Sequence, residues 1–346
     1  MSDKRTEISE LGEFGLIERI AKNTVVRNKS TVLGIGDDAA LIDLGDHLMV
    51  VSSDMLLEGV HFDLSYMPLQ HLGYKSVAVN ISDIAAMNAI PSQVTVNIGI
   101  SNRFSLEAVD AFYQGVNAAC ENFNVDLIGG DTSSSASGLV VSVTAIGNVN
   151  ETNVAKREGA SENDIVCVTG DLGGAYLGLQ VLEREKQVFL ANPEMQPQLD
   201  KYDYIVQRQL KPEARMDIVY ELADLNVVPT SMIDISDGLG SELLHLSKAS
   251  GLGVQIFEDK LPIDKQTYDT GRELGIDATT AVLNGGEDYE LLFTVNQNEY
   301  EKIKLHADIH FIGHMHKESD SNVMQTKGGN AVRIMAQGWN HYKNGI

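Results

Sequence analysis

Aspartate residues recur in five short segments, and together their side chains could do chemistry. The segments are GIGDDAAL (34–41), VVSSD (50–54), NISDIAAM (80–87), LIGGD (127–131) and IDISDGL (233–239). Four of them directly follow a short apolar run, and the segment around Asp83 lies in a helical pattern. Two carboxylates about 5 Å apart repel by roughly 3 kcal/mol at an effective dielectric near 20. If the segments converge, the acids must hold protons or bind cations, and ligand sets made of oxygen alone suit Mg²⁺, Mn²⁺ or Ca²⁺.

Each segment taken singly also has an ordinary structural explanation. Asp37 and Asp38 are adjacent, so in an extended segment their side chains point in opposite directions and only one would face a metal. VVSSD could equally be a helix N-cap, and LIGGD could be a turn. In IDISDGL, a cap formed by Ser236 or Asp237 explains one acid but not both Asp234 and Asp237.

Other residue types indicate less. His61 follows Asp54 by seven residues, and a lone histidine is more often structural than functional. His314 and His316 could bind a metal on one strand face, but a structural role is favoured. The chain has neither a Gly-Lys dipeptide nor a GxGxxG opening a helix, so the commonest phosphate-binding loops are absent. A bound nucleotide would need metal ions to neutralise its phosphates.

Composition narrows the class of protein. A length of 346 residues allows two domains, and the net charge of −23 argues against a nucleic-acid partner. The two cysteines, Cys120 and Cys167, form no CxxC motif and fit reduced thiols in a cytoplasmic protein. The N-terminal residues lack the apolar core of a secretory signal, and no apolar run approaches the roughly 18 residues of a membrane span.

Hydrophobic periodicity predicts strands alternating with helices, and a change of composition places a domain boundary near 150–160. In the first half, Ser105 is the expected cap of one helix. We expect strands at 47–52, 93–100, 124–128, 138–149, 164–170, 254–257 and 309–313, and one after GGEDYEL. We expect helices at 13–22, 73–88, 105–123, 174–184, 213–224 and from ISDGL to about 250. Residues 185–203 contain Pro193 and Pro197 and read as a polar surface excursion.

The order of these segments resembles the thiamine-monophosphate kinase family, within the superfamily of aminoimidazole ribonucleotide synthetase. The resemblance rests on GEFGLI (12–17), GIGDDAAL, SSD with GVHF, KSVAVNISDIAAM (75–87), LIGGDTS, REGA, IDISDGL and GGEDYEL, with a weaker match at 338–342. It implies transfer of the γ-phosphoryl group of ATP to thiamine monophosphate, giving thiamine diphosphate and ADP. It also implies an α+β, two-domain fold in a homodimer. The N-terminal domain (1–152) would pair its sheet into a barrel at the dimer interface, and the C-terminal domain (153–346) would be an α/β sandwich.

The same resemblance implies roles for individual residues. Those expected to bind several Mg²⁺ ions are Asp38, Ser52, Ser53, Asp54, Asp83, Asp131, Asp234 and Asp237. Those expected to contact ATP are Tyr113, Gly130, Asp131, Arg157 and Ser236. Those expected on the thiamine-phosphate side are His61, Glu287 and Trp339. Asp54, Asp83, Asp131 and Asp234 are the expected catalytic residues.

The chemistry would need no side-chain nucleophile, because an acceptor phosphate oxygen is already ionised at pH 7. We therefore expect direct transfer without a phosphoenzyme, with positioning and charge neutralisation doing most of the catalysis. Arg157 would supply a fixed cation near the triphosphate. Three alternatives remain open: another ATP-dependent synthetase of the superfamily (selenophosphate or aminoimidazole ribonucleotide synthetase-like), a metal-dependent phosphatase, and a non-catalytic divalent-metal binder.

Overall fold

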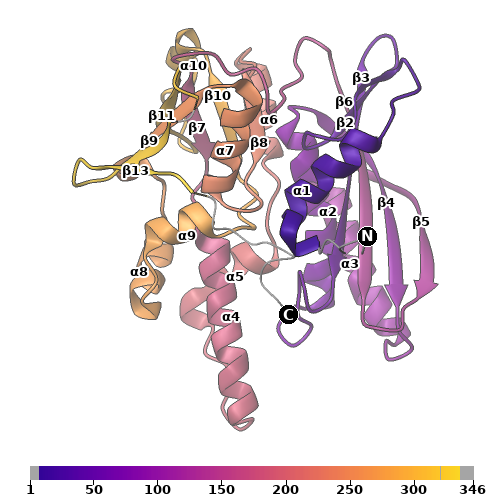
Figure 1. Ribbon diagram of the computed structural model, residues 1–346. Coiled ribbons are helices and arrows are strands. Elements are labelled where there is room, and N and C mark those ends of the chain that lie inside the picture. Colours follow the sequence, from indigo (N-terminus) through magenta and orange to yellow (C-terminus); the bar gives the residue numbers. More distant parts are fainter. Residues whose placement is uncertain (1–7, 320, 336–346) are drawn as a thin grey trace, which may run out of the picture.

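The computed structural model describes residues 8–319 and 321–335, which form two sheets with helices packed on them (Figure 1). The strand order is β1-β2-β3-β6-β4-β5 in the first sheet and β13-β12-β9-β11-β7-β10-β8 in the second. The first sheet consists of β1 (Thr31–Leu33), β2 (Ala40–Asp43), β3 (Leu48–Leu57), β4 (Ile90–Ile100), β5 (Asp126–Ser134) and β6 (Val140–Val149). The second consists of β7 (Ile165–Thr169), β8 (Ser231–Asp234), β9 (Gly253–Phe257), β10 (Leu291–Val295), β11 (Ile309–His316), β12 (Asn322–Gln325) and β13 (Ala331–Arg333).

The described helices precede or lie between these strands along the chain, singly or in groups. They are α1 (Ile8–Asn23), α2 (Leu69–Ala86), α3 (Leu106–Phe123), α4 (Gly174–Ala191), α5 (Asp203–Leu210), α6 (Met216–Asp224), α7 (Leu239–Ser250), α8 (Lys265–Leu274), α9 (Ala278–Asn284) and α10 (Tyr300–Ile303). None of the helices in the described part of the chain combines the length and apolar character that a bilayer crossing needs.

The first sheet is covered by helices on one face. Its strands pair antiparallel except β4 with β5, which are parallel. On β3, Val50, Ser52 and Leu56 are buried while Ser53 and Met55 between them are exposed, so alternate side chains reach opposite faces. Helices α2 and α3 pack together on the buried face. The expected barrel does not form within one chain, because β1 and β5 remain separate edges of an open sheet.

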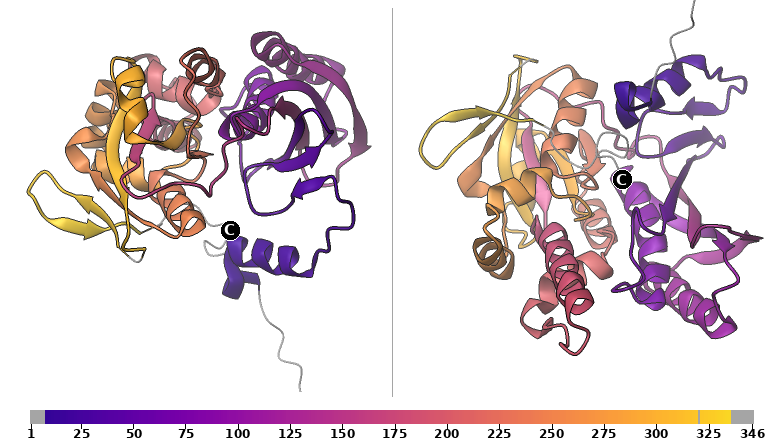
Figure 2. Two further views of the ribbon diagram at one scale, coloured as in Figure 1. Left: turned by 90° about the horizontal axis from the view of Figure 1, so that it is seen from above. Right: turned by 60° about the horizontal axis from the view of Figure 1, so that its bottom comes forward.

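Strands β7, β8 and β10 of the second sheet are buried on both faces. Along β7, Val166 and Val168 join one hydrophobic cluster while Cys167 between them joins another. On β10 the same alternation places Leu292 in one cluster and Phe293 in the other. Such strands read as continuous apolar runs in the sequence. Seen from above, the two sheets with their helices lie side by side (Figure 2).

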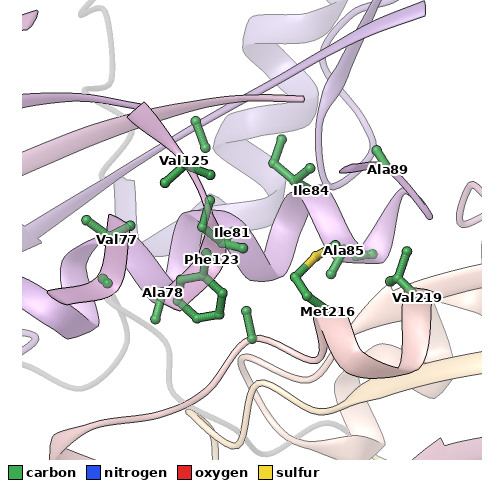
Figure 3. Close-up of a cluster of buried hydrophobic side chains, with 14 of the residues drawn as sticks. Val77, Ala78, Ile81, Ile84, Ala85, Ala89, Phe123, Val125, Met216 and Val219 are labelled. Atoms are coloured by element: carbon green, nitrogen blue, oxygen red, sulfur yellow. The ribbon is translucent and has the colours of Figure 1, made fainter. Parts of the chain in front are cut away.

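Helix α2 joins the two halves through a shared core. Its side chains are buried almost all round, and Ile81 and Ala85 lie in one cluster with Met216 and Val219 of α6 (Figure 3). That cluster continues onto β10 through Phe293. Burying a large aliphatic side chain contributes about 1.5–3 kcal/mol, so this core holds α2 firmly against both sheets.

The structure corrects several expectations about local structure. Helix α4 runs to Ala191, so residues 185–203 begin as helix, and α5 starts at Asp203. Asp54 and Asp131 lie inside β3 and β5 rather than behind them. Ser105 does cap α3, accepting a hydrogen bond from the Ala108 backbone N–H.

Candidate active site

Carboxylates from three separate elements meet between the two sheets. Oxygen atoms of Asp38, Asp83 and Asp234 all lie within 4.8 Å of one another. Asp38 is in the turn between β1 and β2, Asp83 is on α2, and Asp234 is the last residue of β8. The Asp54 carboxylate on β3 is close enough to raise the pKa of both Asp83 and Asp234. We call these four residues the acid cluster. Three of them come from the first sheet and the helix packed on it, and the fourth, Asp234, comes from the second sheet.

The periodicity of β3 and α2 aligns two sides of the acid cluster. Ser52 and Asp54 are two residues apart on β3 and therefore share a face. The Ser52 hydroxyl donates to Asp83 Oδ2, and the Asp54 backbone N–H donates to Asn80 Oδ1 at 2.9 Å. Asn80 and Asp83 are three residues apart on α2 and share one side of the helix. The polar stripe of an otherwise apolar helix is thereby matched to the polar end of β3.

Arg157 distinguishes the two acids of GIGDDAAL. Its guanidinium Nη2 lies 2.6 Å from Asp38 Oδ1, while its backbone N–H donates to both oxygens of Asp37 at 3.3 and 3.2 Å. Asp38 thus belongs to the acid cluster and Asp37 anchors the loop that carries Arg157. The two adjacent carboxylates therefore have different main partners in the structure.

The acid cluster is electrostatically strained as it stands. Burial first, then the charges of Asp54, Asp234 and Asp38, hold the pKa of Asp83 well above its usual range. Burial, followed by the charge of Asp38, raises the pKa of Asp234 to about 7. Burial also raises the pKa of Asp38, against the opposing charge of Arg157. Because removing carboxylates from water disfavours their ionised form, a bound cation would relieve this cost.

A hard divalent cation fits the atoms present. Asp38 Oδ2 is buried and has no hydrogen-bond partner, so its lone pairs are available to a cation. The donor set contains only oxygen, which suits Mg²⁺ better than zinc or copper. Within the described residues, no other group of three acidic, histidine or cysteine side chains has this spacing, and His314 and His316 are not part of such a group.

The IDISDGL segment differs from expectation at its helix start. Neither Ser236 nor Asp237 caps α7; the N-cap is Gly238, without a side-chain bond. Instead the Glu242 carboxylate accepts from the Asp237 backbone N–H at 2.9 Å. Glu242 is almost fully buried, and burial followed by the charge of Asp237 holds its pKa well above its usual range. Glu242 was not predicted as part of this region; the only signal in the sequence is an acid in the first turn of the helix, which is common for helix N-termini in general.

The residues expected on the thiamine-phosphate side lie in two loops. Glu287, between α9 and β10, forms an ion pair with Lys75 of α2 at 2.9 Å, and its backbone N–H donates to the Ser236 carbonyl at 2.7 Å. His61 is in the loop after β3, where its Nδ1 accepts from the Leu57 backbone N–H at 3.0 Å. Trp339 lies outside the described residues. Lys75 was missed by sequence reasoning, although a lysine within the apolar pattern KSVAVNI is a detectable signal.

Asp131 is not brought to the acid cluster within one chain. The register pairs Asp54 with Val143, Val143 with Val96, and Val96 with Gly130. Asp131 is one residue further, so its side chain lies on the opposite face of the sheet from Asp54. Strands β6 and β4 also separate β5 from β3, which corresponds to about 14 Å across the sheet.

The other residues expected in this region have different surroundings and are not members of the acid cluster. Ser53 faces the open side of the sheet, where its hydroxyl lies 3.0 Å from that of Thr144. Tyr113 is half-buried on α3 and packs edge-on against Phe112. Gly130 has φ of +158°, and a Cβ atom there would lie 1.8 Å from the Val96 carbonyl oxygen. The glycine is therefore required for the approach of β5 to β4, whatever else it contacts.

Comparison with known proteins gives a consistent result. The model of the family described as AIR synthase related protein, N-terminal domain, matches residues 36–149. Thiamine-monophosphate kinase of Bacillus subtilis is 36% identical over 344 residues, which cover 96% of this chain and all of that protein. The enzyme of Aquifex aeolicus is 32% identical and covers 97% of this chain and 99% of its own length.

Solved structures agree with these relatives. The structure described as AaThiL complexed with AMPPCP and TMP superposes with a TM-score of 0.83, at 30% identity, and covers 97% of this chain and 99% of that one. The thiamine monophosphate kinase structure from Aquifex aeolicus gives 0.77 at 28% identity, with 95% and 100% covered. A hydrogenase-maturation complex, HypE-HypF, reaches 0.71 at 20% identity, covering 93% of this chain and 99% of that chain, and shows only a common fold.

Proposed function

This chain belongs to the thiamine-monophosphate kinase family and phosphorylates thiamine monophosphate with ATP, and we propose that the acid cluster is where the two phosphate-bearing substrates meet. The main support is that oxygen atoms of Asp38, Asp83 and Asp234 lie within 4.8 Å of one another and that Arg157 forms an ion pair with Asp38. The other synthetases of the superfamily are not favoured, because the Bacillus subtilis and Aquifex aeolicus relatives, which match at 36% and 32% identity over most of the chain, are thiamine-monophosphate kinases.

We propose that Asp38, Asp54, Asp83 and Asp234 would hold Mg²⁺, with Ser52 as a further oxygen donor. Bound there, the metal would supply positive charge to offset the repulsion between two anionic reactants. The remaining expected ligands, Ser53, Asp131 and Asp237, are proposed for additional ions. Ser236 and Arg157 are proposed to contact ATP; Arg157 offers a guanidinium whose fork suits phosphate oxygens.

The chain's own residues would act by holding charge and position. An acceptor oxygen of thiamine monophosphate forms a bond to the γ-phosphorus, the bond to the β–γ bridging oxygen breaks, and ADP leaves with the electron pair. The acceptor oxygen is already ionised, so no base is needed, and no described serine or cysteine is placed in the acid cluster as a nucleophile with a histidine beside it. We propose direct in-line transfer, for which positioning is the main requirement.

We further propose that the enzyme is a homodimer whose sites are completed by the second copy. The support is the uncovered face of the first sheet, where Met55 and Ile128 are more than half exposed and Asp131 faces outward. A second copy on that face would close the two open sheets into the expected barrel. It would also let Asp131 of one copy reach substrates bound at the acid cluster of the other, and Gly130 and Tyr113 stay proposed contacts of ATP.

We also propose a division into two domains and a location in the cytoplasm. The last paired residue of the first sheet is Val149 and the second sheet starts at Ile165, which is compatible with domains of 1–152 and 153–346. A cytoplasmic location is supported by the two buried free cysteines, Cys120 and Cys167.

The deciding experiment is product identification. Purified protein with Mg²⁺, ATP and thiamine monophosphate should form thiamine diphosphate and ADP in equal amounts, and chelation of the metal should stop both. Incubation with γ-labelled ATP alone should leave no label on the protein, as direct transfer requires. ADP formation without thiamine diphosphate from folded protein would overturn the assignment, and a labelled, chemically competent phosphoenzyme would overturn direct transfer.

A further inference from the structure

Lys75 on α2 is a buried cation that the reaction described above does not use. Its side chain is 1% exposed, although an ammonium ion removed from water costs several kcal/mol unless it is well paired. We propose that Lys75 is a positioning residue that fixes the carboxylate of Glu287 for binding of the acceptor, thiamine monophosphate. The inference rests on the proposed function, because it assigns Glu287 to the acceptor side.

Both oxygens of Glu287 are held by groups from other elements. Lys75 Nζ lies 2.9 Å from Glu287 Oε1 and donates to the Gln209 carbonyl at 3.0 Å. Gln209 Nε2 on α5 donates to Glu287 Oε2 at 2.5 Å. The carboxylate is therefore clamped between a helix of the first half of the chain and a helix of the second. A side chain held at both oxygens has little rotational freedom left to lose when a ligand binds.

The backbone around Glu287 is also constrained. Glu287 has φ of +66°, in the left-handed region that costs a non-glycine residue roughly 1 kcal/mol or more. A Cβ atom on Gly286 would lie 2.2 Å from the Ser236 carbonyl oxygen, so only glycine allows the loop to approach so closely. This conformation turns Glu287 toward α2 and leaves its side chain 26% exposed. The carboxylate can therefore meet a ligand, whereas the ammonium of Lys75 cannot.

Glu287 lies beside the segment that carries Asp234, because its backbone N–H donates to the Ser236 carbonyl at 2.7 Å and the Tyr289 N–H donates to the Ile235 carbonyl at 2.9 Å. Burial and the carboxylates of Glu183 and Asp63 are the main causes of the raised pKa of Tyr66, which belongs to the His61 loop. The charge of Glu287 is a smaller cause of the same shift. Burial is the main cause of the raised pKa of Tyr289, and the charge of Glu287 is the next cause, ahead of the charges of Asp54, Asp234 and Asp83. An acceptor with its phosphate at the acid cluster would extend past Glu287. Thiamine monophosphate carries a thiazolium cation and an aminopyrimidine donor, both of which a fixed carboxylate favours.

The test compares Michaelis constants for the two substrates separately. Lys75→Met should raise KM for thiamine monophosphate about tenfold while KM for ATP changes by less than about twofold, because only acceptor binding depends on Glu287. Glu287→Gln should give the same split. The double variant should be no worse than the more affected single variant, because the two residues act as one unit.

A matched control and a second variant complete the design. Lys211→Met removes another lysine at the same contact between α2 and the second half, where it pairs with Glu213 and lies over the Tyr74 ring; it should leave the acceptor KM unchanged. If Lys75→Met does not fold, Gln209→Met, which removes the donor to Glu287 Oε2, should give a smaller rise of the same kind. The proposal would be overturned if the wild-type enzyme is active but a folded Lys75→Met or Gln209→Met variant has an unchanged KM for thiamine monophosphate. It would also be overturned if KM for ATP changes as much as KM for thiamine monophosphate. Absence of thiamine diphosphate from the wild type would instead overturn the proposed function.

Discussion

The Ser82 hydroxyl on α2 donates a hydrogen bond of 2.6 Å to Asp234 Oδ2 at the end of β8. Helix α2 packs on the first sheet and β8 is an edge of the second, so this bond joins the two halves at the acid cluster. It also partly offsets the burial that raises the pKa of Asp234.

Replacing Ser82 with Ala should raise the pKa of Asp234 further, because a hydrogen bond that favours the ionised carboxylate is lost. The acidic limb of kcat/KM against pH should move to higher pH, and the free energy of unfolding should fall by about 1–2 kcal/mol. Ser76→Ala is the control, since the Ser76 hydroxyl is buried on the same helix but donates to the Gly73 carbonyl. Equal pH profiles for the two variants would contradict the linkage to Asp234.

Asp83→Asn should abolish activity yet stabilise the metal-free protein. Asparagine removes the cost of ionising a buried carboxylate beside three others, and its oxygen can still accept from Ser52. The gain is bounded by about 3 kcal/mol, the repulsion of two carboxylates about 5 Å apart at an effective dielectric near 20. Denaturant unfolding in the presence of a chelator measures it. Asp217→Asn is the control and should lower the free energy of unfolding, because Arg215 pairs with that carboxylate at 2.8 Å and holds its pKa below its usual range. If Asp83→Asn were also less stable than the wild type, the carboxylates of the acid cluster would not repel as described.

Stability of the metal-free protein should fall as pH rises from about 4 to 7. Asp234 titrates near 3.8 when unfolded but near 7 when folded, so in this window the folded state binds more protons. The free energy of unfolding therefore decreases with rising pH. This difference in pKa corresponds to a decrease of about 4 kcal/mol in the free energy of unfolding, to which Asp234 and the neighbouring acids contribute together. Saturating Mg²⁺ should flatten this slope, and a slope that is the same with and without metal would argue against a cation at the acid cluster.

Mixing two inactive variants tests whether Asp131 acts across a dimer. Asp83→Asn and Asp131→Asn should each be inactive alone, the second because it lacks the ligand that the other copy needs. In a mixed dimer, one site has an intact acid cluster and receives the native Asp131 from the other copy. After subunit exchange, an equal mixture should regain about a quarter of wild-type turnover if exchange is statistical, because half the dimers are mixed and each has one complete site. No recovery despite proven exchange would mean that Asp131 acts within its own chain or not at all.

Local patterns predicted much of the first half of the chain. Ser105 was identified as a helix cap because capping depends on neighbouring backbone groups, and the polar side of α2 was visible at Asn80 and Asp83. The short strand β8 and the helices α8 and α9 were not predicted, because their patterns are too brief to distinguish from loop. Helix α4 extends beyond 184 because residues 185–191 contain neither glycine nor proline, and it ends at Ala191, shortly before Pro193.

The sequence alone showed that carboxylates recur in five motifs, since residue type and motif order are written along the chain, and it was the resemblance of those motifs to a known family that assigned Arg157 to the same site. Only the tertiary structure decided which acids meet. Asp54 and Asp131 belong to similar motifs, yet a shift of one residue in strand register places them on opposite faces of one sheet. Lys75 and Glu287 are far apart in sequence, and their pairing follows from how α2 packs between the two sheets, a long-range relationship that no local pattern contains.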